Sequence, residues 1–190
     1  FAEALPDARI AGVLPGDGVD KWRRINEEHR FNVPHVVALG GATRFESVRR
    51  GLGALPDADV IAVTDGVRPF VSHGLIRLLT EEAAEYGSAV ASTPVYDTLR
   101  RRNGEVSEKA DRNEFFTVQT PQVFRGDALR RAYEAAGDGD GFTDDASVAE
   151  AFGIPVRYVM GERSNMKITS PEDMAVARAV YAWERAAKRG

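Results

Sequence analysis

The chain has 190 residues, of which 43% are hydrophobic and 28% are charged, and its formal net charge is −4. These values are typical of one globular domain and exclude a disordered or collagen-like chain. The acidic balance argues against a nucleic-acid partner, and the sequence has no apolar run long enough for a membrane span. The absence of Cys excludes disulfides and thiolate metal sites and favours a cytoplasmic location.

The first half of the chain alternates short apolar runs with amphipathic segments. The run Val60 to Thr64 is almost continuously apolar, which predicts a strand buried on both faces of a parallel sheet. The alternation predicts strands over residues 9–14, 35–39, 60–64 and 88–92, and helices over residues 17–30, 43–55 and 75–86.

A β-hairpin is predicted next. Asn103-Gly104 separates two strand-like runs, 96–102 and 106–112, and this dipeptide is a strong hairpin signal. The hairpin carries three consecutive Arg residues, 100–102, and Lys109. Because such side chains cannot fill a core, we expect the hairpin to project from the domain as an arm.

The second half returns to the alternating pattern. We predict a loop at Thr120-Pro121-Gln122 between two short strands, and Thr143 as the N-cap of a helix. Strands alternating with helices predict an α/β fold with a mainly parallel sheet covered on both faces. The remaining predicted strands span residues 115–118, 122–124 and 156–160, and the helices span 126–136, 144–151 and 171–188.

Polar residues gather where predicted strands end, which is where sheets of this kind bind ligands. Gly40-Gly41-Ala42 opens a helix, so it is either an anion-binding turn or a plain strand–helix turn. Asp65 and Arg68 follow the most apolar strand, where they could hold a metal and a phosphate or form a local ion pair.

Two further positions carry two readings each. Thr143 is either a helix cap or a ligand contact. Lys167 lies between Met166 and Ile168 and is one of only four Lys among 25 basic residues, so it is either a phosphate ligand or an ordinary surface residue.

Several of these segments together resemble the cytidylyltransferases of the non-mevalonate isoprenoid pathway, which join CTP to 2-C-methyl-D-erythritol 4-phosphate. They occur in the family's order and cover nearly the whole chain. The matching segments are GGATRFESV (40–48), DGVRPFVS (65–72), TPVYDTLRRR (93–102), ADRNEFFTVQTPQVF (110–124), FTDDASVAEAFG (142–153) and ERSNMKITSPEDM (162–174).

The resemblance implies a Rossmann-like nucleotidyltransferase fold, a three-layer sandwich forming a single domain over 1–190 with a β-arm at 96–112. It implies a nucleotidyl transfer with Mg²⁺, in which CTP and a sugar-alcohol phosphate are the substrates and a second copy of the chain is the partner in a homodimer. Ribitol 5-phosphate cytidylyltransferase, which shares the fold and the donor, is an alternative.

The resemblance also assigns roles to individual residues. Asp65, Arg68 and Lys167 would be catalytic, with Asp65 also a metal ligand. The cytosine and ribose of CTP would lie beside Gly40, Gly41, Ala42 and Ser47, and further substrate contacts would come from Thr120, Thr143 and, reaching into the partner's site, Thr98 and Arg112.

One part of the family pattern has no match in this sequence. The family begins with a strand that is central in its sheet, followed by a Gly-rich loop whose Arg and Lys bind the triphosphate. We therefore expect this chain to be an incomplete record of a longer protein, and a fully paired sheet within it would contradict that expectation. A non-catalytic nucleotide-binding or dimer-scaffold protein is the alternative from another class.

Overall fold

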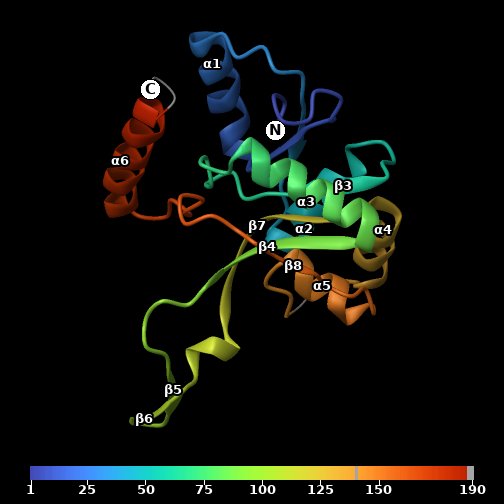
Figure 1. Cartoon of the computed structure of the whole chain (residues 1–190). Helices are drawn as coiled ribbons and strands as arrows, with labels where there is room; N and C mark the ends of the chain where they lie inside the picture. Colours follow the sequence, from blue (N-terminus) through green and yellow to red (C-terminus); the bar gives the residue numbers. More distant parts are fainter. Residues whose placement is uncertain (140, 188–190) are drawn as a thin grey trace.

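The computed structural model describes residues 1–139 and 141–187 (Figure 1). The predicted alternation is confirmed, with most boundaries within a few residues of expectation. Its strands are β1 (Ala11–Leu14), β2 (Val36–Leu39), β3 (Val60–Val63), β4 (Ser88–Pro94), β7 (Phe116–Arg125) and β8 (Tyr158–Met160). Its helices are α1 (Val19–His29), α2 (Arg44–Gly53), α3 (His73–Tyr86), α4 (Gly126–Ala135), α5 (Asp145–Ala151) and α6 (Pro171–Ala187), with short 3-10 turns at Gly16–Gly18 and Arg112–Glu114. Lys188, the predicted end of the last helix, lies outside the described residues.

The main sheet has the order β3-β7-β4-β8. Strands β3 and β4 are both antiparallel to β7, and β8 is parallel to β4, so three of the four strands run in one direction. Strands β1 and β2 form a separate parallel pair. These pairings confirm the predicted α/β fold with a mainly parallel sheet.

Strand β7 replaces two short strands and the loop that the sequence predicted. The predicted loop is wrong, because the backbone stays extended through Pro121 even though proline lacks the N–H that a strand ladder uses. Thr120–Pro121 is a cis peptide inside one ten-residue strand. The pairing of β4 with β7 shifts register between Val90 and Ser92, opposite this segment, so the missing N–H of Pro121 does not end the ladder.

Strand β3 is less buried than its apolar sequence predicted. All four of its residues are half-buried, and among the described strands it pairs with β7 alone. Its residues nevertheless pack on both faces of the sheet, Ile61 and Val63 on the α4 side and Val60 and Ala62 on the α3 side, so the predicted two-sided packing is present but the burial is incomplete.

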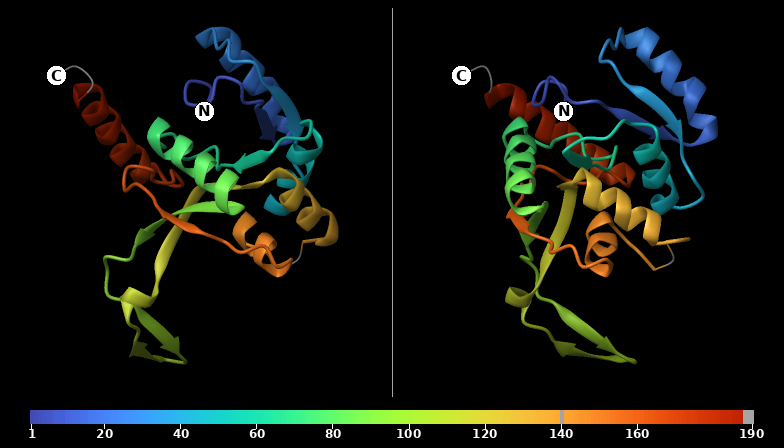
Figure 2. Two further views of the ribbon diagram at one scale, coloured as in Figure 1. Left: turned by 45° about the vertical axis from the view of Figure 1, so that its right-hand side comes forward. Right: turned by 90° about the vertical axis from the view of Figure 1, so that its right-hand side faces the viewer.

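The core lies on both faces of the main sheet. Alternate β4 residues point in opposite directions, so Val90 packs with Leu129 and Tyr133 of α4. Ala89 and Ala91 pack on the other face, against Leu75, Leu79 and Ala83 of α3. Figure 2 shows α3 on one side of the sheet and α4 and α5 on the other. The domain is therefore a three-layer sandwich.

The predicted arm is present. Its strands, β5 (Arg100–Asn103) and β6 (Val106–Lys109), form an antiparallel hairpin whose residues are all exposed. Figures 1 and 2 show that it projects away from the sheet. Within residues 1–139 and 141–187, no helix is both long and apolar enough to cross a membrane.

The strands do not form one continuous sheet. In the described part of the chain, the β1–β2 pair is not joined to β3 by strand pairing. Strand pairing among the described residues therefore leaves one edge of β1 and one edge of β3 free.

Candidate active site

Asp65 lies just beyond the carboxyl end of β3 and faces three cations. Lys167 Nζ is 3.1 Å from Asp65 Oδ2, and Arg68 Nε is 3.5 Å from the same oxygen. Arg44 Nε is 3.7 Å from Oδ1. The structure thus brings together three of the residues that the sequence singled out, Asp65, Arg68 and Lys167, and adds Arg44, which the sequence analysis missed.

Arg68 is only partly satisfied by its neighbours. Its Nη1 donates to the carbonyl of Asn165 at 2.8 Å, but its buried Nε makes no hydrogen bond with any described residue and only the 3.5 Å ion pair with Asp65. A buried guanidinium that is held this loosely can still donate a hydrogen bond to an anionic ligand.

The segment that carries Lys167 is fixed to the end of β3. The N–H of Ile168 donates to the carbonyl of Val67 at 2.9 Å. Asn165 is fully buried, and its Nδ2 donates to the carbonyl of Thr120 at 2.8 Å. These bonds explain how residues far apart in sequence meet at Asp65.

Gln119 is a second residue that the sequence analysis missed. Its Nε2 donates to the carbonyl of Glu162 at 2.8 Å, and its Oε1 accepts from the N–H of the same residue at 3.3 Å. The side-chain amide of Gln119 therefore bonds to both the N–H and the carbonyl of Glu162, as the backbone of a paired strand does, and holds the loop before Lys167. An amide side chain directly before Thr120, between apolar residues on either side of the segment, was the available signal.

Backbone N–H groups in the Gly40-Gly41 turn are bonded to side chains of the helix that follows. The N–H of Gly41 donates to Ser47 Oγ at 3.0 Å, and the N–H of Ala42 donates to Glu46 Oε2 at 2.7 Å. Thr43 caps α2 through the N–H of Glu46. A Cβ on Gly41 would lie 2.2 Å from the Cβ of Glu46, so glycine is needed there for packing. These contacts favour the plain strand–helix turn over an anion site on these N–H groups.

Arg44, the first residue of α2, also pairs with a buried carboxylate. Its Nη2 donates to Asp145 Oδ2 at 2.6 Å, and the Tyr133 hydroxyl donates to Asp145 Oδ1 at 2.6 Å. Burial lowers the pKa of Arg44, but the hydrogen bond and charge of Asp145 outweigh it and raise the pKa above its usual value. Burial, then the charge of Asp145, raises the pKa of Tyr133. Arg44 is therefore cationic and Tyr133 protonated at neutral pH.

The N-cap of α5 is Asp144 and not Thr143, so the predicted cap was displaced by one residue. Asp144 Oδ1 accepts from the N–H of Ser147, and its Oδ2 accepts from Gln122 Nε2 at 2.9 Å. Asp144 is the cap because its carboxylate accepts hydrogen bonds both from the helix N-terminus and from the buried amide of Gln122. Thr143 is exposed just before the helix and does not cap it, so of its two predicted roles the helix cap is excluded.

The arm residues do not reach the Asp65 cluster of their own chain. Arg112 is exposed, and its guanidinium donates to the carbonyl of Tyr96 at the base of the arm. Thr98 is also exposed. Within the described part of the chain, neither residue makes a hydrogen bond or ion pair with the Asp65 cluster, and the arm that carries them projects away from the sheet.

The donor set at Asp65 does not fit a metal held by the protein. Within the two described stretches, no three His, Asp or Glu side chains lie close enough to form a metal cluster. Asp65 is a single carboxylate facing three cations, whereas Mg²⁺ prefers several oxygen ligands. Arg44, Arg68 and Lys167 against Asp65 and Asp145 leave one net positive charge, which suits an anionic ligand.

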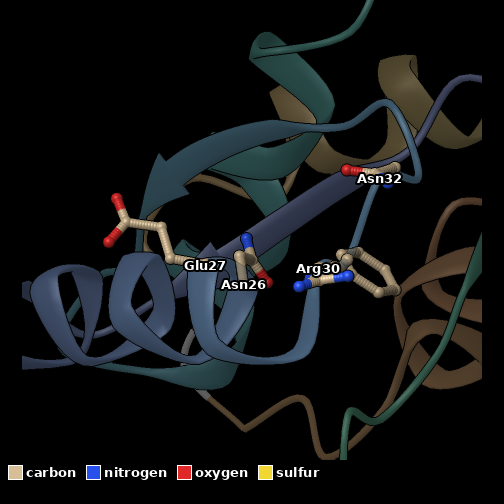
Figure 3. A pocket seen from close by; sticks show the side chains of 5 residues that line it. Asn26, Glu27, Arg30 and Asn32 are labelled. Carbon is tan, nitrogen blue, oxygen red and sulfur yellow. The ribbon is translucent and has the colours of Figure 1, made fainter.

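A separate hollow of about 450 Å³ lies at the C-terminal end of α1, where Asn26, Glu27, Arg30, Phe31 and Asn32 line it (Figure 3). It contains none of the candidate residues, and Figure 3 shows Asn26 and Glu27 on the last turn of the helix. We assign it no role.

Comparison with known proteins gives a consistent result. The family model described as 2-C-methyl-D-erythritol 4-phosphate cytidylyltransferase matches residues 9–182. A relative with that name from Bacteroides fragilis is 46% identical over 172 residues, which cover 90% of this chain and 78% of the relative. One from Bacillus pumilus is 43% identical over 168 residues, covering 86% and 73%.

Solved structures agree. The crystal structure of 2-C-methyl-D-erythritol 4-phosphate cytidylyltransferase from Thermus thermophilus is 36% identical, with a TM-score of 0.79 over 95% of this chain and 86% of that one. The 4-diphosphocytidyl-2C-methyl-D-erythritol synthase of Anaerococcus prevotii is 29% identical, with a TM-score of 0.81 over 92% and 78%.

Proposed function

The chain belongs to the 2-C-methyl-D-erythritol 4-phosphate cytidylyltransferase family, and we propose that it transfers CMP from CTP to 2-C-methyl-D-erythritol 4-phosphate at the Asp65 cluster. The observation that supports the site assignment is the meeting of Arg68, Lys167 and Asp65, in which the buried Arg68 Nε has an ion pair with Asp65 but no hydrogen bond among the described residues. The names of the relatives favour this acceptor over ribitol 5-phosphate.

In this reaction an oxygen of the acceptor phosphate attacks the α-phosphorus of CTP. The bond to the β-phosphate breaks, and pyrophosphate leaves with its electron pair. Both reactants are anions, so catalysis consists chiefly of neutralising charge and aligning the two phosphates. Lys167 stabilises charge at the α-phosphate, Arg68 binds the acceptor phosphate, and Asp65 orients both cations and contacts the acceptor.

The nucleotide lies, in this proposal, at the end of β2. Gly40, Gly41, Ala42 and Ser47 border the cytosine and ribose through their surfaces, since the N–H groups of Gly41 and Ala42 are occupied within the turn. Thr120 and the exposed Thr143 supply further contacts to substrate.

Mg²⁺ accompanies CTP in this proposal and would neutralise part of the phosphate charge when bound. Because the donor set at Asp65 does not fit a metal held by the protein, we derive no step through the ion.

We propose a homodimer in which the arm (96–112) places Thr98 and Arg112 at the partner's site. The support is the projection of the arm and the exposure of apolar residues along its base and β7, among them Tyr96, Phe115 and Phe116. The reaction is placed in the cytoplasm because the sequence has no Cys.

We also propose that a further strand lies between β1 and β3. The support is that neither strand has a second pairing partner among the described residues. Buried backbone groups left without partners cost about 1–3 kcal/mol each, which a marginally stable domain cannot easily bear. Reading the gene upstream of Phe1 tests this proposal directly, and a stop codon in frame before any strand and Gly-rich loop would contradict it.

The activity is tested by pyrophosphate release from the full-length gene product with CTP and each acceptor in turn. Release with 2-C-methyl-D-erythritol 4-phosphate and much less with ribitol 5-phosphate is expected. Preference for the second acceptor would reassign the substrate. CTP binding without release from either would favour the scaffold alternative.

A further inference from the structure

Arg44 connects the Asp65 cluster to the hydrophobic core. Its guanidinium contacts two carboxylates at once, Asp145 at 2.6 Å and Asp65 at 3.7 Å. The Asp145 side chain has no exposed surface, whereas that of Asp65 is 16% exposed and faces the candidate site. One arginine therefore joins a buried anion to the anion at the site.

The buried end of this link is held firmly. Tyr133, itself 2% exposed, donates its hydroxyl to the second oxygen of Asp145. The Tyr133 ring stacks on Phe45, the residue after Arg44, with ring centroids 4.7 Å apart. Helices α2, α4 and α5 thus each contribute one residue to the support of this guanidinium. Because close packing leaves Tyr133, Phe45 and Asp145 few alternatives, the Nη2 end of the Arg44 guanidinium is held in place.

A buried ion pair of this kind is weak evidence for a role in stability, since its desolvation cost offsets much of its attraction. Its geometry suggests a different use. Lys167 and Arg68 both lie on segments without regular secondary structure, and both meet Asp65. Arg44, in contrast, is fixed by the core, so it defines where the Asp65 carboxylate sits.

We propose that Arg44 is a positioning residue, which holds Asp65 and, through it, Lys167 and Arg68 in the geometry that CMP transfer needs. This inference rests on the proposed function of the cluster. A displacement of about 1 Å at such a site lowers turnover by about a hundredfold, so a loose Asp65 is expected to reduce kcat more than binding.

The test uses the full-length gene product. Removing Arg44 alone would leave Asp145 buried and unpaired, so the main variant is the double change Arg44→Gln with Asp145→Asn. Its two amides can still hydrogen-bond to each other and to Tyr133, but Asp65 loses its fixed cation. We expect a Tm close to that of the wild type, kcat lower by at least about tenfold, and KM for both substrates changed by less than about threefold. Arg44→Lys, which keeps the charge without the planar fork, should give an intermediate kcat.

Two further variants separate positioning from stability. Tyr133→Phe retains both charges and the ring, and should lower kcat at least about threefold with KM unchanged. Arg130→Gln is the control, because Arg130 is a partly buried arginine that donates to the carbonyls of Leu52, Leu55 and Pro56 and has no role in the proposal. It should lower Tm but not kcat.

Wild-type kcat in the folded double variant or in Tyr133→Phe would overturn the inference, as would an equal loss of kcat in Arg130→Gln. Absence of pyrophosphate release from the wild type with either acceptor would instead overturn the proposed function.

Discussion

The Thr120 hydroxyl accepts a hydrogen bond from the backbone N–H of Asp65 at 2.9 Å. Thr120 is 4% exposed and lies in the middle of β7, while Asp65 follows β3, so this bond fixes the backbone of the candidate catalytic carboxylate to the neighbouring strand. Asn165 donates to the carbonyl of the same threonine. Thr120 therefore acts as the common attachment point of the two segments that carry Asp65 and Lys167.

Thr120→Val removes the acceptor and keeps the shape of the side chain. The N–H of Asp65 then loses its partner, at a cost of about 1–3 kcal/mol, and the carboxylate loses its fixed direction. We expect the free energy of unfolding to fall by that amount and kcat to fall by at least about tenfold, measured by denaturant unfolding and pyrophosphate release. Thr117→Val is the matched control, since its hydroxyl, on the same strand β7, pairs with Thr93 of the neighbouring strand β4 and does not contact Asp65. Equal losses of kcat in both variants would contradict a specific role for Thr120.

Lys167→Met removes the ammonium group while keeping a side chain of similar length. Because the Lys167 side chain is 47% exposed and makes an ion pair only with Asp65 among the described residues, its loss should change Tm little. Losing a charge that stabilises the transition state is expected to lower kcat by about a hundredfold or more. Lys21→Met on the exposed surface of α1 serves as the control. Retained turnover in Lys167→Met would refute the assigned role.

The sequence predicted the alternating elements well because their apolar periodicity is local. The hairpin at Asn103-Gly104 is confirmed for the same reason, since turn chemistry acts within four residues. The failures involve competition between partners that are distant in sequence. Asp144 caps α5 in place of Thr143 because Gln122, more than twenty residues earlier, needs its carboxylate.

The candidate site was predictable only where a residue type was unusual. Asp65, Arg68 and Lys167 differed from their surroundings in sequence, and they meet in the structure. In the sequence, Arg44 is an ordinary first-turn residue of a helix. Its place in the candidate site depends on its ion pair with Asp145, which lies 101 positions later. Gln119 was not predictable from a loop at 120–122, because its role depends on a continuous strand that aims its side chain at Glu162, just before Lys167.

Asp65→Asn separates two roles of this carboxylate. As an organiser of cations, Asp65 is needed at every metal concentration, so the variant should show low kcat with the same half-saturating Mg²⁺ concentration as the wild type. As a metal ligand, its loss should raise that concentration and let excess Mg²⁺ restore turnover. We expect the first result, from the three cations that surround it. Recovery of turnover in excess Mg²⁺ would show that Asp65 binds the ion.

The raised pKa of Tyr133 predicts a loss of stability in alkali. In the unfolded chain a tyrosine loses its proton near pH 10, whereas burial and Asp145 keep the proton on Tyr133 in the folded protein. The folded state therefore binds more protons above about pH 10, and its stability falls as pH rises through that region. Tyr133→Phe has no hydroxyl to titrate. The difference between its free energy of unfolding and that of the wild type should therefore shrink between about pH 9 and 11, as measured by urea unfolding. A constant deficit would contradict the prediction.

The arm gives a prediction that does not depend on locating the dimer contacts. If Arg112 serves the partner's site, Arg112→Ala and Lys167→Ala chains are each inactive alone, but a mixed dimer contains one site with the intact lysine and the intact arm. Random reassociation of equal amounts makes half of the dimers mixed, and one of their two sites works. About one quarter of wild-type turnover is therefore expected after the chains are unfolded together and refolded. An arm that acts on its own chain gives no recovery, because each chain would then carry its own defect. Mixing without refolding is the control, and it should recover turnover only as fast as subunits exchange.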